Sequence, residues 1–262
     1  MANESKTSNL FRNLLRKANY FDDKPIIVEE QQSDNAKISK LLTSASKRGM
    51  GKGFPDFIIY SSRHSEVIIV VECKADINKH ESNTLDNYAD RATDGALLYA
   101  SFLSKEYDVL AIAVSGESEN KCRITHYLQL KGEKKSHQLF SDKIMPFDDY
   151  YEGINQSNYK FNQDYSKLVI YTKTLNEQLH AKKIKESQRA LLISGILIAL
   201  KDKSFEEGYK KHKTIKQLIG TLYVAIVGQL TESDIPTKRI DALAQAFTFI
   251  KTNPTLGDPR RP

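Results

Sequence analysis

The chain has 262 residues, of which 40% are hydrophobic and 27% charged, and this composition is typical of a folded globular protein and not of a disordered one. The excess of 39 Lys and Arg over 33 Asp and Glu gives a net charge of +6, which suits a polyanionic partner or, equally, a merely basic protein. Two cysteines are too few for a disulfide framework, and neither a secretory leader nor a membrane-length apolar run occurs, so we expect a soluble cytoplasmic protein with no membrane partner.

The first part of the sequence predicts helices and a loop. Helices are expected over residues 10–20 and 35–46, where apolar residues recur every three or four positions. Between them, residues 26–32 are apolar and then acidic, and no element is assigned to them. Residues 47–53 (KRGMGKG) form a basic, glycine-rich loop that does not suit regular structure.

Two β-rich runs follow this loop, at residues 55–60 (PDFIIY) and 66–74 (EVIIVVECK), with a turn between them. Five consecutive apolar residues, Val67–Val71, are typical of a strand that is buried on both faces. Residues 1–145 are therefore predicted to form an α/β domain, whose remaining elements are a helix at 88–103 and strands at 109–115 and 123–130.

The pattern changes after residue 145. Residues 146–163 contain a proline, a glycine and many amide side chains, and they are predicted to form a linker. Residues 164–255 follow a helical period throughout, which predicts an all-α bundle, and the run 190–200 is apolar nearly all round and is expected to be a buried helix. Residues 256–262 continue no pattern and are expected to be a non-native or disordered tail.

Asp56, Glu72 and Lys74 form a candidate catalytic site. Alternate side chains of a strand share a face, so Glu72 and Lys74 point the same way. If the strand after Asp56 pairs antiparallel with theirs, two carboxylates meet and offer hard oxygen ligands to Mg²⁺, with Mn²⁺ as a substitute. The metal ion would activate water, and the lysine would orient that water and stabilise the transition state. The sequence therefore predicts hydrolysis of phosphodiester bonds.

This spacing also arises by chance at the solvated ends of strands, but two features favour a site. Glu72 and Lys74 directly follow a buried apolar run, where a charge is costly unless it is paired or bound to a metal. The loop residues Lys47, Arg48 and Lys52 come just before Asp56, where they are expected to contact a phosphate backbone.

Other titratable residues are less specific. Glu29 or Glu30 could add a metal ligand, and Glu30 is preferred, although a solvent-exposed acidic end of the segment is an equal alternative for each. The histidines show no zinc-binding spacing; His64, His80 and His126 could lie near the site, but a surface position is preferred for each.

Five stretches resemble the nuclease domain of fused restriction–modification enzymes, of type IIG and more distantly type I: VEEQ (28–31), KRG (47–49), GFPDFII (53–59), VECK (71–74) and DGALLYA (94–100). The run QRALLISGILIAL (188–200) is similar to the helical connector that precedes the adenine methyltransferase domain of these enzymes. The resemblance covers residues 10–255. It implies a core of the PD-(D/E)XK restriction-endonuclease type, with a mixed sheet flanked by helices and followed by a helical bundle. It also implies that Asp56, Glu72 and Lys74 are the catalytic residues.

The resemblance further implies an Mg²⁺-dependent endodeoxyribonuclease that acts on double-stranded DNA beside the methyltransferase and target-recognition domains of a parent enzyme. Neither an S-adenosylmethionine motif nor an Asn-Pro-Pro-Tyr-type motif occurs, so the chain itself should not methylate DNA and should lack sequence specificity. Dimerisation for double-strand cleavage stays open. A catalytically idle DNA-binding or assembly module, and a stand-alone repair nuclease or resolvase, remain alternatives.

Overall fold

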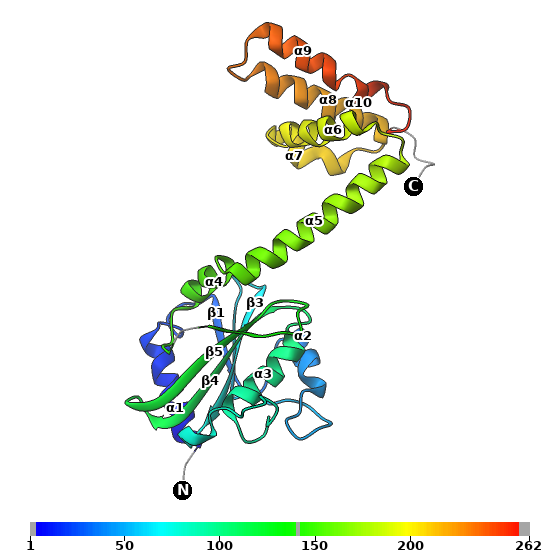
Figure 1. Ribbon diagram of the computed structural model, residues 1–262. Coiled ribbons are helices and arrows are strands. Elements are labelled where there is room, and N and C mark those ends of the chain that lie inside the picture. Colours follow the sequence, from blue (N-terminus) through cyan, green and yellow to red (C-terminus); the bar gives the residue numbers. More distant parts are fainter. Residues whose placement is uncertain (1–3, 140–141, 257–262) are drawn as a thin grey trace. The chain divides into compact units, whose positions relative to one another are not determined.

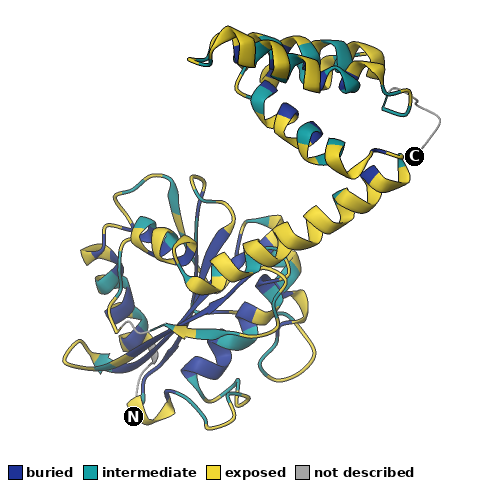
Figure 2. Cartoon of the chain, turned by 45° about the horizontal axis from the view of Figure 1, so that its top comes forward, coloured by how far each residue is buried: buried dark blue, intermediate teal, exposed yellow. Residues whose placement is uncertain are grey.

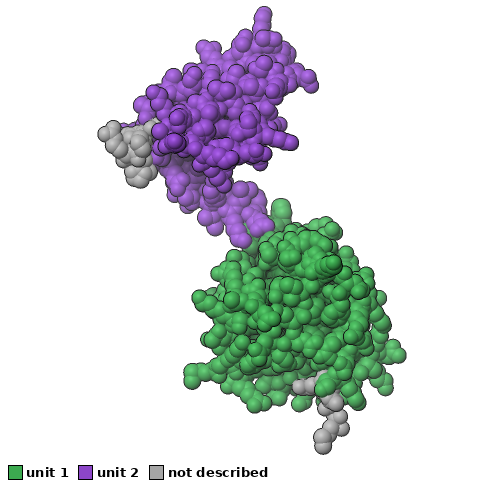
Figure 3. Space-filling view, turned by 180° about the vertical axis from the view of Figure 1, so that it is seen from behind, with its two compact units in different colours: residues 1–163 green, residues 164–262 purple. Residues whose placement is uncertain are grey.

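The computed structural model describes residues 4–139 and 142–256 of the chain. The chain divides into two compact units, residues 1–163 and residues 164–262 (Figure 3). Within the described ranges, no helix is both long and apolar enough to cross a membrane. Most of the predicted tail, residues 257–262, lies outside the described residues, whereas Leu256 packs against the core of the second unit.

The first unit is a mixed α/β fold built on one six-stranded sheet in the order β1-β2-β3-β4-β5-β6 (Figure 1). Neighbouring strands are antiparallel except β3 and β4, which run parallel because the chain crosses over through α3 between them. The strands are β1 (Ile26–Glu30), β2 (Phe57–Ser61), β3 (Val67–Lys74), β4 (Asp108–Ser118), β5 (Lys121–Gln129) and β6 (His137–Leu139). The helices are α1 (Glu4–Lys17), α2 (Ala36–Leu41), α3 (Ala92–Leu103), α4 (Phe147–Asn155) and the start of α5 (Asn158–Ala181), with short 3-10 turns η1 (Leu42–Ser44) and η2 (Ile77–Lys79).

Alternation along the strands divides the core of this unit into two layers. One layer packs Phe57 and Val71 with residues of α1 and α4, and the other packs Ile58 and Val70 with residues of α2 and α3. Every residue of β3 is buried, and Figure 2 shows the central strands of the sheet in the dark blue of buried residues. The prediction of a strand buried on both faces is therefore confirmed, and the parity of a residue decides which helical layer it meets.

Several element boundaries differ from the prediction. The strands β1 and β6 were not predicted, and α3 begins at Ala92, four residues later than expected. The segment predicted as a linker, 146–163, contains α4 and the beginning of α5. Phe147, Tyr150 and Ile154 of α4 are buried in the layer with α1, so this segment contributes to the core of the first unit.

The second unit is all-helical and has its own hydrophobic core. Its elements are the remainder of α5, then α6 (Glu186–Ala199), α7 (Lys203–Gly208), η3 (Tyr209–Lys211), α8 (Ile215–Thr231), α9 (Thr237–Phe247) and α10 (Phe249–Thr252). The expectation that the run 190–200 is buried all round is wrong. Leu192 and Ala199 lie in the core of this unit, where α6 packs against α8 and α9, but Ile193 and Leu197 are exposed.

Candidate active site

The β2–β3 hairpin brings the two predicted carboxylates together. Phe57 pairs with Val71 in an antiparallel register, so the preceding Asp56 lies alongside Glu72. The N–H of Cys73 donates a hydrogen bond of 2.6 Å to Oδ2 of Asp56, which turns the aspartate across the strand end toward β3. Glu72 and Lys74 lie on the face of the sheet that α3 covers, as alternation predicts.

Glu72 is a buried carboxylate between two lysines. Its residue is 1% exposed, and its Oε1 accepts from Lys47 Nζ at 2.5 Å and lies 3.2 Å from Lys74 Nζ. Burial and, next to it, the charge of Asp56 raise the pKa of Glu72, the two lysines lower it, and the net result is a pKa of about 7. An additional positive charge nearby would therefore stabilise the ionised carboxylate of Glu72.

Helix α3 packs closely against Glu72 at Gly95. A Cβ atom at Gly95 would lie 3.1 Å from Cγ of Glu72 and 3.0 Å from the carbonyl oxygen of Tyr88, which is tighter than ordinary contact. The absence of a side chain at this position thus lets the helix pack directly on the carboxylate. Gly95 belongs to a stretch that carried the family resemblance, but the sequence alone did not indicate its contact with Glu72.

Gln31 is a site residue that the sequence analysis missed. It follows Glu30, the register partner of Phe57, so it lies alongside Asp56, and its Nε2 donates to Oδ1 of Asp56 at 3.3 Å. Its backbone is left-handed, with φ at 64°, which is uncommon for a residue other than glycine. Such conformations gather at functional sites, but the strand that ends at Glu30 had to be seen before Gln31 could be placed.

The basic loop at residues 47–53 lies beside these carboxylates, and Lys47, which the sequence predicts to contact a phosphate backbone, pairs with Glu72 instead of pointing into solvent. Its ammonium group reaches inward to Glu72 and lies 5.8 Å from the ring centre of Tyr99. A cleft of about 500 Å³ opens at this place. Its walls include all of the predicted catalytic and DNA-contacting residues, namely Asp56, Glu72, Lys74, Lys47, Arg48 and Lys52, together with Gln31 and Asp90.

Glu30, the preferred third metal ligand, does not join this group. Its register partner Phe57 faces the layer with α1, so Glu30 points to the opposite side of the sheet from Glu72. There it forms a two-pronged ion pair with Arg12, at 2.6 and 2.5 Å, which lowers the pKa of Glu30. Glu29 has the right parity and a buried Oε2 with no hydrogen-bond partner among the described residues, but its Oε1 accepts from Tyr60 and from the N–H of Asp34, and it does not line the cleft.

The donor set fits a magnesium ion. Oε2 of Glu72 is buried and has no hydrogen-bond partner among the described residues, and Asp56 is the neighbouring carboxylate. Mg²⁺ is usually held by one or two carboxylates together with water and substrate phosphate, so two are sufficient. Over residues 4–139 and 142–256, no group of three or more acidic, His or Cys residues is arranged to hold a metal.

Two of the three histidines expected at the surface are buried. His80 is 1% exposed, and its ring bonds Ser115 at 2.7 Å and Thr125 at 3.0 Å, while burial lowers its pKa to about 4. Ser115 is the register partner of Lys74, so this polar cluster supports the strand ends beside the site. His126 is buried against Tyr150, at 2.7 Å from its hydroxyl group.

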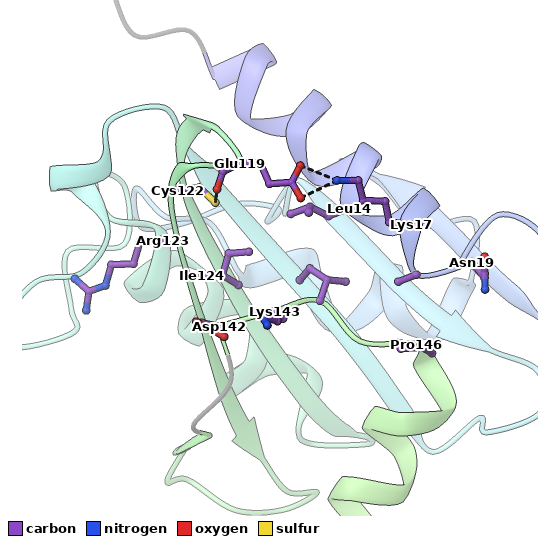
Figure 4. A pocket seen from close by; sticks show the side chains of 12 residues that line it. Leu14, Lys17, Asn19, Glu119, Cys122, Arg123, Ile124, Asp142, Lys143 and Pro146 are labelled. Carbon is purple, nitrogen blue, oxygen red and sulfur yellow. Dashed lines mark hydrogen bonds and ion pairs between the residues drawn. The ribbon is translucent and has the colours of Figure 1, made fainter.

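A second cavity, of about 630 Å³, lies where the end of α1 meets the β4–β5 hairpin (Figure 4). Lys17 forms an ion pair of 2.7 Å with Glu119 at its edge, and the thiol of Cys122 donates to the carbonyl oxygen of Glu119. None of the predicted site residues lines this cavity. The candidate catalytic and DNA-contacting residues therefore gather at the cleft beside Glu72 and not at this cavity.

The chain is similar to a curated protein of Heyndrickxia coagulans named type II restriction enzyme and methyltransferase RM.BcgI. The two are 25% identical over 267 aligned positions, which cover 90% of this chain and 40% of the relative. The chain thus spans about two fifths of the length of the relative it matches. No family model and no solved structure matches the chain. The similarity connects this chain with restriction–modification.

Proposed function

We propose that this chain is the DNA-cleaving part of a restriction–modification protein of the type IIG kind, an Mg²⁺-dependent endodeoxyribonuclease of the PD-(D/E)XK type. The observation that carries the proposal is the cleft in which Asp56, Glu72 and Lys74 lie beside basic loop residues. The similarity to a restriction enzyme and methyltransferase over 90% of this chain supports it independently.

Each residue has a role that its position allows. The carboxylate of Asp56 and the unpartnered Oε2 of Glu72 would hold the metal. Bound Mg²⁺ supplies charge neutralisation at the phosphate and lowers the pKa of a water molecule, and Mn²⁺ would substitute for it. Lys74, only 7% exposed and next to Glu72, would hold the attacking water and stabilise the negative charge that develops on the phosphate oxygens.

Arg48 and Lys52 would contact the backbone of double-stranded DNA, because both line the cleft and phosphate contacts position a protein without reading sequence. Sequence specificity and methylation would then come from the target-recognition and methyltransferase domains of a longer parent protein, acting in the cytoplasm. Cutting both strands would need a second copy of the active site or a second cleavage event.

Two other functions make different predictions. A catalytically idle DNA-binding or assembly module would bind DNA equally well without divalent metal, and it would gain nothing from a carboxylate whose burial is costly. A stand-alone repair nuclease or resolvase would prefer branched DNA to linear duplex. The buried Glu72 favours the nuclease over the idle module, and the similarity to a restriction enzyme favours restriction over repair.

The test is plasmid cleavage with Mg²⁺ or Mn²⁺ by the unaltered chain, by Lys74→Ala and by Lys79→Ala. Lys79 is exposed five residues further along, so its variant removes the same side chain and charge outside the cleft. We expect cleavage by the unaltered chain and by Lys79→Ala, and a loss of about 100-fold or more in Lys74→Ala, the usual scale for a group that stabilises transition-state charge. Equal cleavage by all three would refute the role of Lys74, and no cleavage by the unaltered chain would refute an autonomous nuclease.

A further inference from the structure

Two lysines, from different parts of the chain, meet one oxygen atom of the buried Glu72. Lys47 Nζ lies 2.5 Å and Lys74 Nζ 3.2 Å from Oε1, while Oε2 has no hydrogen-bond partner among the described residues. The proposed function needs one of these lysines, and the sequence assigned the other to DNA contact. The presence of both at one carboxylate therefore requires an explanation.

These two lysines balance the charges of the two carboxylates, and Arg48, Lys52 and Asp90 also line the cleft. Asp56 and Glu72 contribute two negative charges, and Lys47 and Lys74 contribute two positive charges beside them. A divalent cation bound by the carboxylates would add two positive charges within a few ångströms of both ammonium groups. Like charges at such separations repel strongly in a partly buried site, so the binding of a metal ion should drive one ammonium group away.

The surroundings of the two lysines indicate which one leaves. The side chain of Lys74 is 9% exposed and belongs to a central strand that is buried at every residue. The side chain of Lys47 is 25% exposed and extends from a loop whose tip, at Met50, is fully exposed to solvent. Gly49 and Gly51 in this loop have φ angles of 108° and 125°. Lys47, which is more exposed and extends from a loop, therefore has more room to rotate away from Glu72 than Lys74, whose side chain is enclosed at the end of a buried strand.

We propose that Lys47 is a displaceable counter-ion of the metal site: its ammonium group neutralises Glu72 in the metal-free protein and is released into the cleft when a divalent cation binds. This inference rests on the proposed function, because it requires that Asp56 and Glu72 hold the cation. It changes the role of Lys47 from a simple phosphate contact to a competitor of the metal, so the apparent metal affinity falls in proportion to the fraction of molecules in which the pair is open.

The test is the chemical reactivity of individual lysines toward an acetylating reagent, measured by mass spectrometry without DNA and with or without saturating Mg²⁺ or Ca²⁺. Lys52 is the internal control, because it belongs to the same loop, lines the same cleft and has intermediate exposure like Lys47. We expect the reactivity of Lys47 to rise on metal addition, by up to about tenfold if the pair is closed in roughly nine of ten metal-free molecules, and that of Lys52 to stay constant. In Glu72→Gln, Lys47 should be reactive from the start and insensitive to metal.

Calorimetric titration of the same samples with Ca²⁺ separates the two ways in which the inference could fail. If the metal binds, if Asp56→Asn abolishes the binding, and if the reactivity of Lys47 is still unchanged, then the displacement is refuted and the proposed metal site stands. If no metal binds to the unaltered chain without DNA, the displacement is refuted, whereas the proposed function is refuted only by the failure of plasmid cleavage, in which substrate phosphate completes the metal site. A rise that Lys52 shares equally would be a general effect of the metal on the loop and would also refute a specific role for Lys47.

Discussion

Replacing Glu72 by glutamine should stabilise the metal-free first unit at alkaline pH. The side chain is fully buried, and its pKa in the folded protein rises from 4.5 to about 7. At about 1.4 kcal/mol per pH unit, ionising this group in the folded state costs about 3 kcal/mol relative to the unfolded state. Glutamine has the same shape and carries no charge, so Glu72→Gln should remove this cost.

The sign of the effect depends on pH. Because the pKa is raised in the folded state, the unfolded chain ionises first as the pH rises, and stability is lost between pH 4.5 and about 7. The variant should therefore be more stable than the unaltered chain by about 3 kcal/mol at pH 8, and nearly equal to it at pH 4. Saturating Mg²⁺ at pH 8 should restore the stability of the unaltered chain and leave the variant unchanged.

Hydrogen exchange of the β3 amides, followed by mass spectrometry, is the suitable assay, because it reports the opening of the sheet separately from the helical unit. Glu152→Gln, in which an exposed carboxylate of α4 is replaced, serves as the control and should have little effect. Equal protection of β3 in the unaltered chain and in Glu72→Gln at pH 8 would refute the reasoning that the carboxylate is held at a cost.

Two further outcomes follow from the packing around the site. Gly95→Ala should lower DNA cleavage at least about tenfold, because its Cβ would press on Glu72. Gly153→Ala, in the open part of α4, is the control and should leave cleavage unchanged while stabilising the helix by about 0.5–1 kcal/mol. Plasmid cleavage measures the first effect and denaturant unfolding the second, and full activity of Gly95→Ala would contradict the close contact. His80→Gln should weaken the acid sensitivity of the fold, because burial holds the pKa of His80 near 4 instead of 6.5. The free energy of unfolding of the unaltered chain should therefore fall by about 3 kcal/mol between pH 6.5 and 4, whereas the variant should keep this stability. The same dependence of stability on pH in both proteins would disprove this.

The central hairpin of the fold was predictable from sequence because its signals are local. The apolar run of β3 and the turn before it define the hairpin, and alternation places Glu72 and Lys74 on one face. The edge strand β1 was missed because its five residues end in two glutamates and show no clear alternation. It is a strand because it pairs with β2, and that pairing is a tertiary property.

The composition of the cleft was harder to predict than its two carboxylates. Glu30 lies on the wrong face because β1 pairs with β2 in a register that places Gln31, and not Glu30, beside Asp56. Lys47 turns inward to form an ion pair with the buried carboxylate of Glu72, and no local sequence pattern reveals that these two residues meet. His80 is buried because Ser115 and Thr125 satisfy both of its ring nitrogens, and these residues come from two later strands.

The β2–β3 hairpin also determines how the sequence of this site can change during evolution. Asp56 and Glu72 are separated by fifteen residues, but most of that interval is the two strands and the exposed turn at residues 62–66. Residues inserted in the turn would lengthen a surface loop at small entropic cost and leave the two carboxylates side by side. A single residue inserted within either strand would rotate one carboxylate to the opposite face of the sheet. Homologous chains should therefore vary in the number of residues between the two acids, and the variation should be confined to the turn.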